Sequence, residues 1–89
     1  MGRRRLPSTI NRAVNIYKLL LTLGEPTSTP ELLKKAMDLM PDIDYSALYQ
    51  GLRLLRNKGL VEQRPYGKTS YWKVLKVLDE RSLREILSK

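Results

Sequence analysis

The chain has 89 residues, a length that fits one domain with a small core, and we predict a single domain over residues 1–89. It contains no cysteine and no histidine, so disulfides, thiol nucleophiles, the usual zinc ligands and the most common general base are absent; an enzyme is disfavoured, and no metal or cofactor is expected. Seventeen basic residues against nine acidic ones give a net charge of +8, which favours a polyanionic partner.

The first predicted elements are a basic arm and a helix. Residues 1–8 form the arm and contain three successive arginines. The helix is expected to start near residue 10, with Ser8 or Thr9 as its cap, and Gly24 should end it. Its apolar residues recur at helical spacing and are Ile10, Val14, Tyr17, Leu20 and Leu21.

A second helix is predicted after Thr27-Ser28, a pair with the composition of a turn. Thr29 is its expected N-cap, and Pro30 suits its first position, where no backbone N–H is needed. Pro41 should end it. Its expected buried side consists of Leu32, Leu33, Ala36, Met37 and Met40.

A third helix is predicted from about Tyr45 to Asn57, with Asp44 as its N-cap and Gly59 just past its end. Residues 60–64 and 70–74 then have the pattern of two strands, joined by residues 65–69 into a hairpin with a basic tip. A short amphipathic helix is expected near residues 80–88.

The adjacent aromatic residues Tyr71 and Trp72 must face opposite sides of the second strand of this hairpin. One of them is therefore expected to close the core against the helices, and the other to stay at the surface or contact a partner.

The third helix divides into an apolar and a polar side when its residues are placed at 100° intervals. The apolar stripe consists of Leu48, Gly51, Leu52 and Leu55. The opposite side consists of Ser46, Gln50, Arg53 and Asn57, flanked on one side by Tyr49 and Arg56. Leu54 lies off the stripe and is either a surface leucine or packs on the first helix or on a partner subunit.

The polar side of this helix carries groups suited to duplex DNA, since glutamine pairs with adenine and arginine with guanine. The alternative is an ordinary solvated face, but such a face usually mixes charges of both signs. This one has no acidic residue, and the hairpin that follows adds Arg64, Tyr66 and Lys68. We therefore predict that helix and hairpin together contact DNA.

The charges along the chain are also segregated. Residues 1–24 carry five basic and no acidic residues, residues 25–44 have a net charge of −3, and residues 45–78 have a net charge of +6. Such segregation favours nucleic acid or an anionic membrane as partner. The basic residues accompany polar positions rather than an exposed apolar face, which disfavours membrane-surface binding. No apolar run reaches the ~20 residues of a membrane span, so we expect a cytoplasmic, nucleoid-associated protein without a signal peptide.

The stretch from Ala47 to Arg64 resembles the PadR-like branch of winged helix-turn-helix regulators. In that family a Leu-Tyr-x-x-Leu-x-x-Leu recognition helix runs into Gly-Leu-(Ile/Val)-Glu, followed by a glycine-containing wing and a tyrosine on the returning strand. The corresponding residues are Leu48, Tyr49, Leu52, Leu55, Gly59, Leu60, Val61, Glu62, Gly67 and Tyr71. The resemblance covers roughly residues 9–76 and implies an α+β, mainly helical winged helix-turn-helix fold of three helices, a two-stranded β wing and a short C-terminal helix.

The resemblance also implies a set of contacts to double-stranded DNA. Ser46, Tyr49, Gln50 and Arg53 would be recognition-helix contacts, with Arg64 and Lys68 as wing contacts. The helix-face and hairpin patterns add Arg56, Asn57 and Tyr66.

Members of this family carry a C-terminal helix or helical domain that serves dimerisation and sometimes effector binding. Only about a dozen residues follow Leu78 here, so no small-molecule effector is expected. A homodimer would use the first helix together with residues 79–89. Apolar residues outside the three-helix core support this interface, because they would otherwise be exposed: Leu75, Val77, Leu78, Leu83, Ile86 and Leu87.

The leading hypothesis is sequence-specific double-stranded DNA binding by a homodimeric transcriptional regulator. The alternative is a partition or DNA-organising protein that binds a centromere-like site and spreads on DNA, with which the lack of an effector module and the triple arginine are compatible. An RNA- or protein-binding winged helix would have a less basic, more apolar recognition helix.

Overall fold

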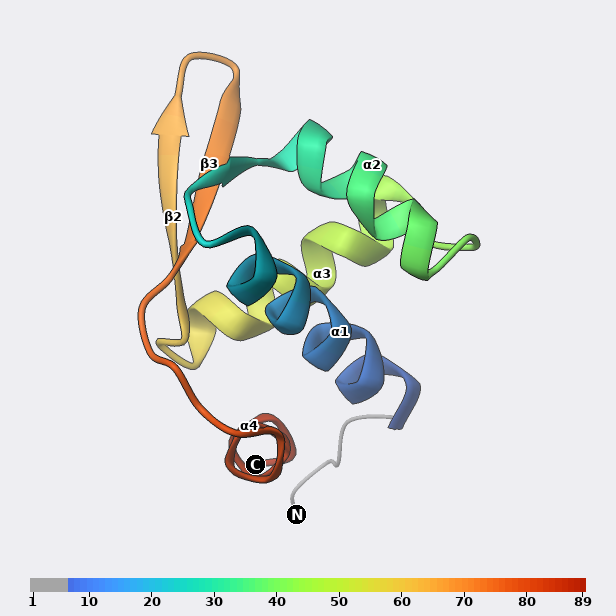
Figure 1. The fold of residues 1–89 in the computed structure, drawn as a ribbon, viewed down its shortest axis with the longest axis vertical. Coiled ribbons are helices and arrows are strands. Elements are labelled where there is room, and N and C mark those ends of the chain that lie inside the picture. The colour runs from blue at the N-terminus through green and yellow to red at the C-terminus, as the bar shows by residue number, and fades with distance from the viewer. Residues whose placement is uncertain (1–6) are drawn as a thin grey trace.

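Four helices and a three-stranded antiparallel sheet make up residues 7–89, which are the residues that this computed structural model describes (Figure 1). The helices are α1 (Pro7–Leu23), α2 (Thr29–Leu39), α3 (Tyr45–Asn57) and α4 (Glu80–Leu87). The strands are β1 (Thr27–Ser28), β2 (Val61–Tyr66) and β3 (Thr69–Val74), in the order β1-β3-β2. This confirms an α+β, mainly helical architecture. The predicted arm, with Arg3–Arg5, lies outside the described residues apart from its last two.

Helix α1 already includes Pro7, so Ser8 and Thr9 lie within it and the prediction that one of them caps it is wrong. Proline is well suited to a first helical turn, because the N–H groups there have no intrahelical acceptor. The predicted end is confirmed. Gly24 has a φ of +70° and donates its N–H to the Leu20 carbonyl at 3.1 Å, a conformation that favours glycine.

The start of α2 differs from the prediction in two ways. Thr27-Ser28 is not a turn but strand β1, paired with Trp72 and Tyr71 of β3. The N-cap is Ser28, whose Oγ accepts the Glu31 N–H at 3.4 Å. Thr29 is buried, and its Oγ1 accepts a bond from Trp72 Nε1 at 2.7 Å. A buried indole N–H requires a partner, so the contact with β3 takes the hydroxyl that the cap would have used.

The apolar side of α2 is narrower than predicted. Leu32 and Ala36 are buried, and Leu33 and Met40 pack against the core from its edge. Met37 is exposed over 47% of its surface, so its assignment to the buried side is wrong. The helix stops at Leu39, before Pro41, as predicted.

Helix α3 has the predicted bounds and ends. The Asp44 carboxylate accepts the Ala47 N–H at 2.8 Å, and Gly59 has a φ of +73°. Its leucine stripe is buried. Leu54 is also buried, at 5% exposure, so it is not a surface leucine. Helix α1 passes very close at Gly51, where an added Cβ would lie 2.5 Å from Ile16 Cδ1. The buried side of α3 is therefore wider than the predicted stripe.

Strands β2 and β3 are joined by a tight turn at Gly67-Lys68, shorter than the predicted connection. Gly67 has a φ of +62°, which a two-residue turn requires. Pro65 belongs to β2, an edge strand, where its missing N–H does not interrupt a sheet. Trp72 is fully buried and Tyr71 is 37% exposed, which confirms that they face opposite sides.

Helix α4 packs on α1 and belongs to the core of the chain. Leu83 and Leu87 are buried, and Leu78 and Ile86 are partly buried against the same cluster. The expectation that these residues would be exposed is therefore wrong. Of the predicted apolar patch, Leu75 and Val77 remain exposed, at 53% and 79%.

The segment between β3 and α4 is bonded to α1. The hydroxyl of Tyr17 donates to the Lys76 carbonyl and accepts the Leu78 N–H at 2.9 Å.

No helix within residues 7–89 combines the length and apolar composition that crossing a membrane requires.

Candidate nucleic-acid interface

One side of α3 is exposed to solvent and carries the four polar residues predicted for it. Ser46, Gln50, Arg53 and Asn57 are all exposed, and no residue of α3 is acidic. Together with Leu54, the side chains of Gln50, Arg53 and Asn57 line an open hollow of about 170 Å³. Among residues 7–89, the ion pairs involve none of the α3 residues. This side of α3 therefore presents donors and a positive charge, and the nearest acidic residue along the chain is the N-cap Asp44.

Two predicted contact residues, Tyr49 and Arg56, lie at the side of α3 that faces the hairpin, and both are half-buried. The guanidinium of Arg56 donates to Gln63 Oε1. The Tyr49 ring meets Trp72 edge-on at 5.9 Å and stacks on Tyr45 at 6.0 Å. These side chains therefore attach α3 to its neighbours, in contrast to the four exposed ones.

Gln63 was not among the predicted contact residues, but it also lies between the hairpin and α3. It sits on β2 opposite Trp72, and its Nε2 donates to Ser70 Oγ at 2.8 Å and to the Tyr49 hydroxyl at 3.5 Å. The signal for it was available, because alternation along the strand places it on the same face as the buried Val61. A polar residue at an inward position of a short strand indicates a bonded side chain.

The hairpin separates the remaining predicted contacts by face. Arg64 pairs with Tyr71 and Tyr66 with Thr69, so Arg64 and Tyr66 lie on the face turned away from Gln63 and α3. Arg64 Nε donates to Glu62 Oε2 at 2.8 Å, an ion pair that reduces its positive field.

The same outer face of the hairpin is partly aromatic. Tyr66 is 73% exposed and meets Tyr71 edge-on at 5.8 Å. With Pro26, Arg64 and Pro65 these two rings line an open hollow of about 430 Å³. The face therefore offers flat apolar surface beside one arginine, and it does not adjoin the exposed side of α3.

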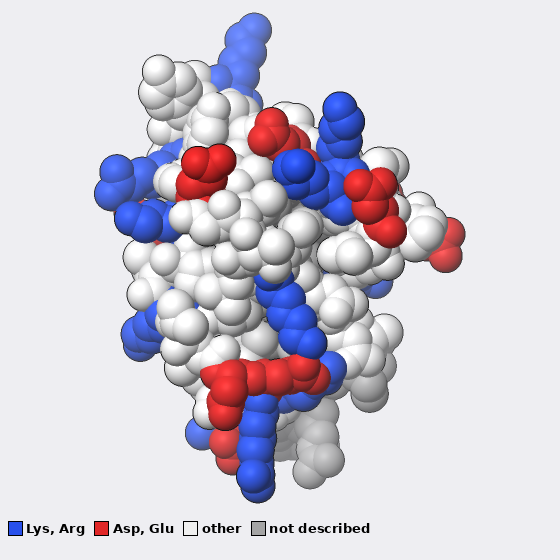
Figure 2. Space-filling model, viewed as in Figure 1, with Lys and Arg blue, Asp and Glu red and all other residues white. Residues whose placement is uncertain are grey.

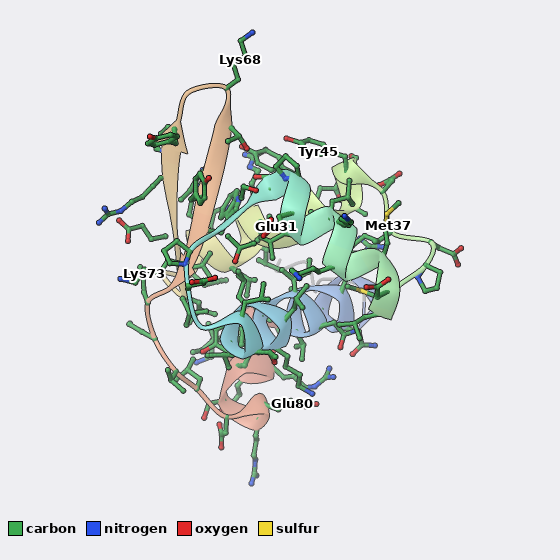
Figure 3. All side chains as sticks on the ribbon, turned by 45° about the horizontal axis from the view of Figure 1, so that its top comes forward. Glu31, Met37, Tyr45, Lys68, Lys73 and Glu80 are labelled. Carbon is green, nitrogen blue, oxygen red and sulfur yellow. The ribbon has the colours of Figure 1, made fainter. Side chains whose placement is uncertain are left out.

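Lys68 lies at the turn of the hairpin and points away from the body of the protein (Figure 3). Over α1 and α2, in contrast, acidic and basic side chains are intermixed (Figure 2). The acidic residues that flank or belong to α2 include Glu31 and Asp38, which are exposed. The side of α3 without acidic residues and the mixed surface of α2 are thus different parts of the molecule.

In comparisons with known proteins, no family model matched the chain, and neither a curated protein nor a solved structure was found similar to it. Within residues 7–89, no three His, Cys, Asp or Glu side chains form a group able to hold a metal ion. The geometry of α3 and the hairpin is therefore the basis for a functional proposal.

Proposed function

We propose that the chain is a winged-helix protein that binds double-stranded DNA, with α3 as the recognition helix and the β2–β3 hairpin as the wing. The observation that carries the proposal is the exposed side of α3, where polar and basic groups stand opposite buried leucines without an acidic residue. The major groove of B-DNA is about 12 Å wide and admits one α-helix. The phosphates of the DNA backbone would attract the positive charge on this side of α3.

Different residues of α3 would contact the bases and the phosphates. Gln50 and Arg53 have the donor and acceptor groups for adenine and guanine edges. Ser46 and Asn57 lie near the two ends of the same exposed side, where they would bond phosphates or bases. Tyr49 and Arg56 would act mainly by holding α3 against the hairpin, because their side chains are half-buried there.

The hairpin would add contacts to the DNA backbone. Lys68 at the tip is the best placed, and Arg64 and Tyr66 on the outer face would meet DNA only where the duplex passes that side. The PadR-like sequence pattern supports the same assignment of helix and wing. We further propose that the protein acts as a homodimeric transcriptional regulator without an effector, and that it performs no catalysis.

The test is selection of bound sequences from a pool of random duplexes, followed by a nuclease footprint on the selected site. Two recognition helices in a two-fold dimer would protect a palindrome with half-sites about 34–36 Å apart. A footprint that lengthens with protein concentration would instead favour a DNA-organising protein that spreads. Failure to enrich any sequence, with equal binding to heparin and DNA, would contradict specific DNA binding.

A further inference from the structure

Gln63 connects the hairpin to α3 through both ends of its amide. Its oxygen accepts from the Arg56 guanidinium of α3, and its nitrogen donates to Ser70 Oγ of β3 at 2.8 Å and to the Tyr49 hydroxyl of α3 at 3.5 Å. All four side chains are half-buried. Since an amide that is partly removed from water is costly to leave without partners, this arrangement is favoured over others in which the hairpin tilts away.

This network lies near the base of the hairpin, so a small change of angle there would move the tip by several ångströms. Trp72, opposite Gln63, is fixed in the core by its bond to Thr29 at 2.7 Å. Strand β1 pairs with β3 at Tyr71 and Trp72, and the tip of the hairpin extends away from the helices, as Figure 1 shows. Tyr66 near the tip is 73% exposed. From Gln63 to the turn is about 13 Å at 3.3 Å per residue, so a tilt of about 20° would displace the turn, with Lys68, by about 4.5 Å. That displacement exceeds the tolerance of a hydrogen bond.

We propose that Gln63 is a positioning residue that fixes the hairpin tip relative to the exposed side of α3. Its consequence for binding rests on the proposed DNA-binding function: α3 and Lys68 would reach the duplex together only while this network holds. The geometric part of the proposal can be tested without DNA.

The geometric test uses the absence of native cysteine. Spin labels attached through Lys68→Cys and Arg53→Cys would report the distance between the tip and α3 by pulsed electron resonance. Gln63→Met, which has similar length and no hydrogen-bonding amide, should broaden and shift the distance distribution. Gln63→Glu keeps the acceptor for Arg56, so its distance distribution should be closer to that of the wild type than the distribution of Gln63→Met is.

Ser70→Ala and Thr69→Val form a matched pair for the same measurement, because both remove one hydroxyl from neighbouring positions on opposite faces of β3. Ser70→Ala should broaden the distribution and Thr69→Val should not. An unchanged distribution in both Gln63→Met and Ser70→Ala would overturn the proposal. Ser70→Ala keeps the test valid if Gln63→Met does not fold.

The functional test compares Lys68→Ala in two backgrounds. In the wild-type background it should lower the slope of log affinity against log salt by about 0.9, the loss of one phosphate contact. In the Gln63→Met background the same change should have little effect, whereas an equal loss of slope in both backgrounds would overturn the role in binding. If the wild type binds no duplex but the label distances respond as expected, the DNA-binding function fails and the positioning role of Gln63 stands.

Discussion

The polar side chains of α3 fall into two groups that differ in what their removal should affect. Gln50 and Arg53 are exposed and lie three residues apart on one side of the helix. Tyr49 and Arg56 are half-buried and bonded or packed against the hairpin. Substitutions in the first group should therefore change binding alone, and substitutions in the second should change stability as well.

We expect Gln50→Ala and Arg53→Ala each to lower the discrimination between a selected duplex and a scrambled one by about 1–3 kcal/mol, the value of one bidentate base contact. Thermal unfolding should be unchanged. Titration of both duplexes with each variant, alongside a thermal melt, measures both effects. Lys35→Ala, which removes an exposed basic residue of α2, is the control. Equal loss on the two duplexes would show that these side chains contact only phosphates.

Tyr17 holds the segment between β3 and α4 on α1 through its hydroxyl. It bonds the Lys76 carbonyl and the Leu78 N–H, and the side chain is buried. Tyr17→Phe would leave both backbone groups without this partner, so we expect the free energy of unfolding to fall by about 1–3 kcal/mol. Urea denaturation measures it. Tyr45→Phe serves as the control, since Tyr45 is exposed and the substitution keeps the ring that stacks on Tyr49. A Tyr17→Phe variant as stable as the control would contradict the assignment.

At the scale of elements, α4 is held on α1 by two kinds of contact. Leu83 and Leu87 are buried. Glu80 bonds Lys18 of α1 and, at 2.9 Å, Arg84 on its own helix. Arg84 in turn donates to the Asn11 side chain at 2.7 Å. The hydrogen bond from Lys18 is the main cause that holds the pKa of Glu80 below its ordinary value, with Arg84 second.

This depressed pKa sets the direction of a pH effect. A carboxyl whose pKa is lower in the folded state stabilises the fold at neutral pH, and the contribution is lost as pH falls through the folded pKa, which lies below the ordinary value for glutamate. The pair is exposed, so the effect should be small. We expect Glu80→Gln to be less stable than wild type at pH 7 and the difference to shrink as pH is lowered through the folded pKa of Glu80. Chemical denaturation at a series of pH values from 7 into acid checks this.

Glu85→Gln is the control for this comparison, because Glu85 lies on the same helix, is exposed, and joins none of the ion pairs found within residues 7–89. Asp79 also has a lowered pKa, caused first by its bond to Ser82. It is present in both variants and cancels in the comparison. A stability difference that persists in acid would show that Glu80 acts through packing and not through its charge.

At the scale of the whole molecule, little of the predicted dimer patch stays exposed. Val77 and Leu75 are exposed, and Val77 borders an open hollow of about 280 Å³ together with Leu20, Leu21 and Val74. Helix α4 supplies Leu83 and Leu87 to the core of its own chain. A dimer, if α1 and the C-terminal segment form it, would therefore use the connection before α4 more than the apolar side of α4 itself.

We expect Val77→Glu to convert a dimer into a monomer and to weaken binding to a palindromic duplex, because a charge on an apolar contact opposes association. Sedimentation at micromolar concentration measures it. Truncation after Val77 is unsuitable, since it would remove two buried leucines. Leu39→Glu, at a leucine of α2 exposed over 60% of its surface, is the control. A wild type that sediments as a monomer would contradict the dimer.

The sequence by itself determined the features that depend on neighbouring residues. Asp44 and Gly59 mark the ends of α3, and the spacing of its leucines distinguishes the buried side from the exposed side that carries Gln50 and Arg53. The alternation of strand residues separates Trp72 from Tyr71. Helix caps, helical periodicity and strand alternation depend on residues a few positions apart, so they can be recognised without knowing how the chain folds.

The tertiary structure decided what lies between elements. Strand β1 has two residues and exists because β3 offers it partners. Leu54 is buried although it lies off the leucine stripe, and α1 lies very close to α3 at Gly51. Gln63 binds Arg56 across two elements, and α4 packs its leucines into the core of its own chain. These contacts join residues that lie on different elements and meet only once the chain has folded. Their geometry depends on how the helices and the sheet pack, which local sequence patterns do not determine.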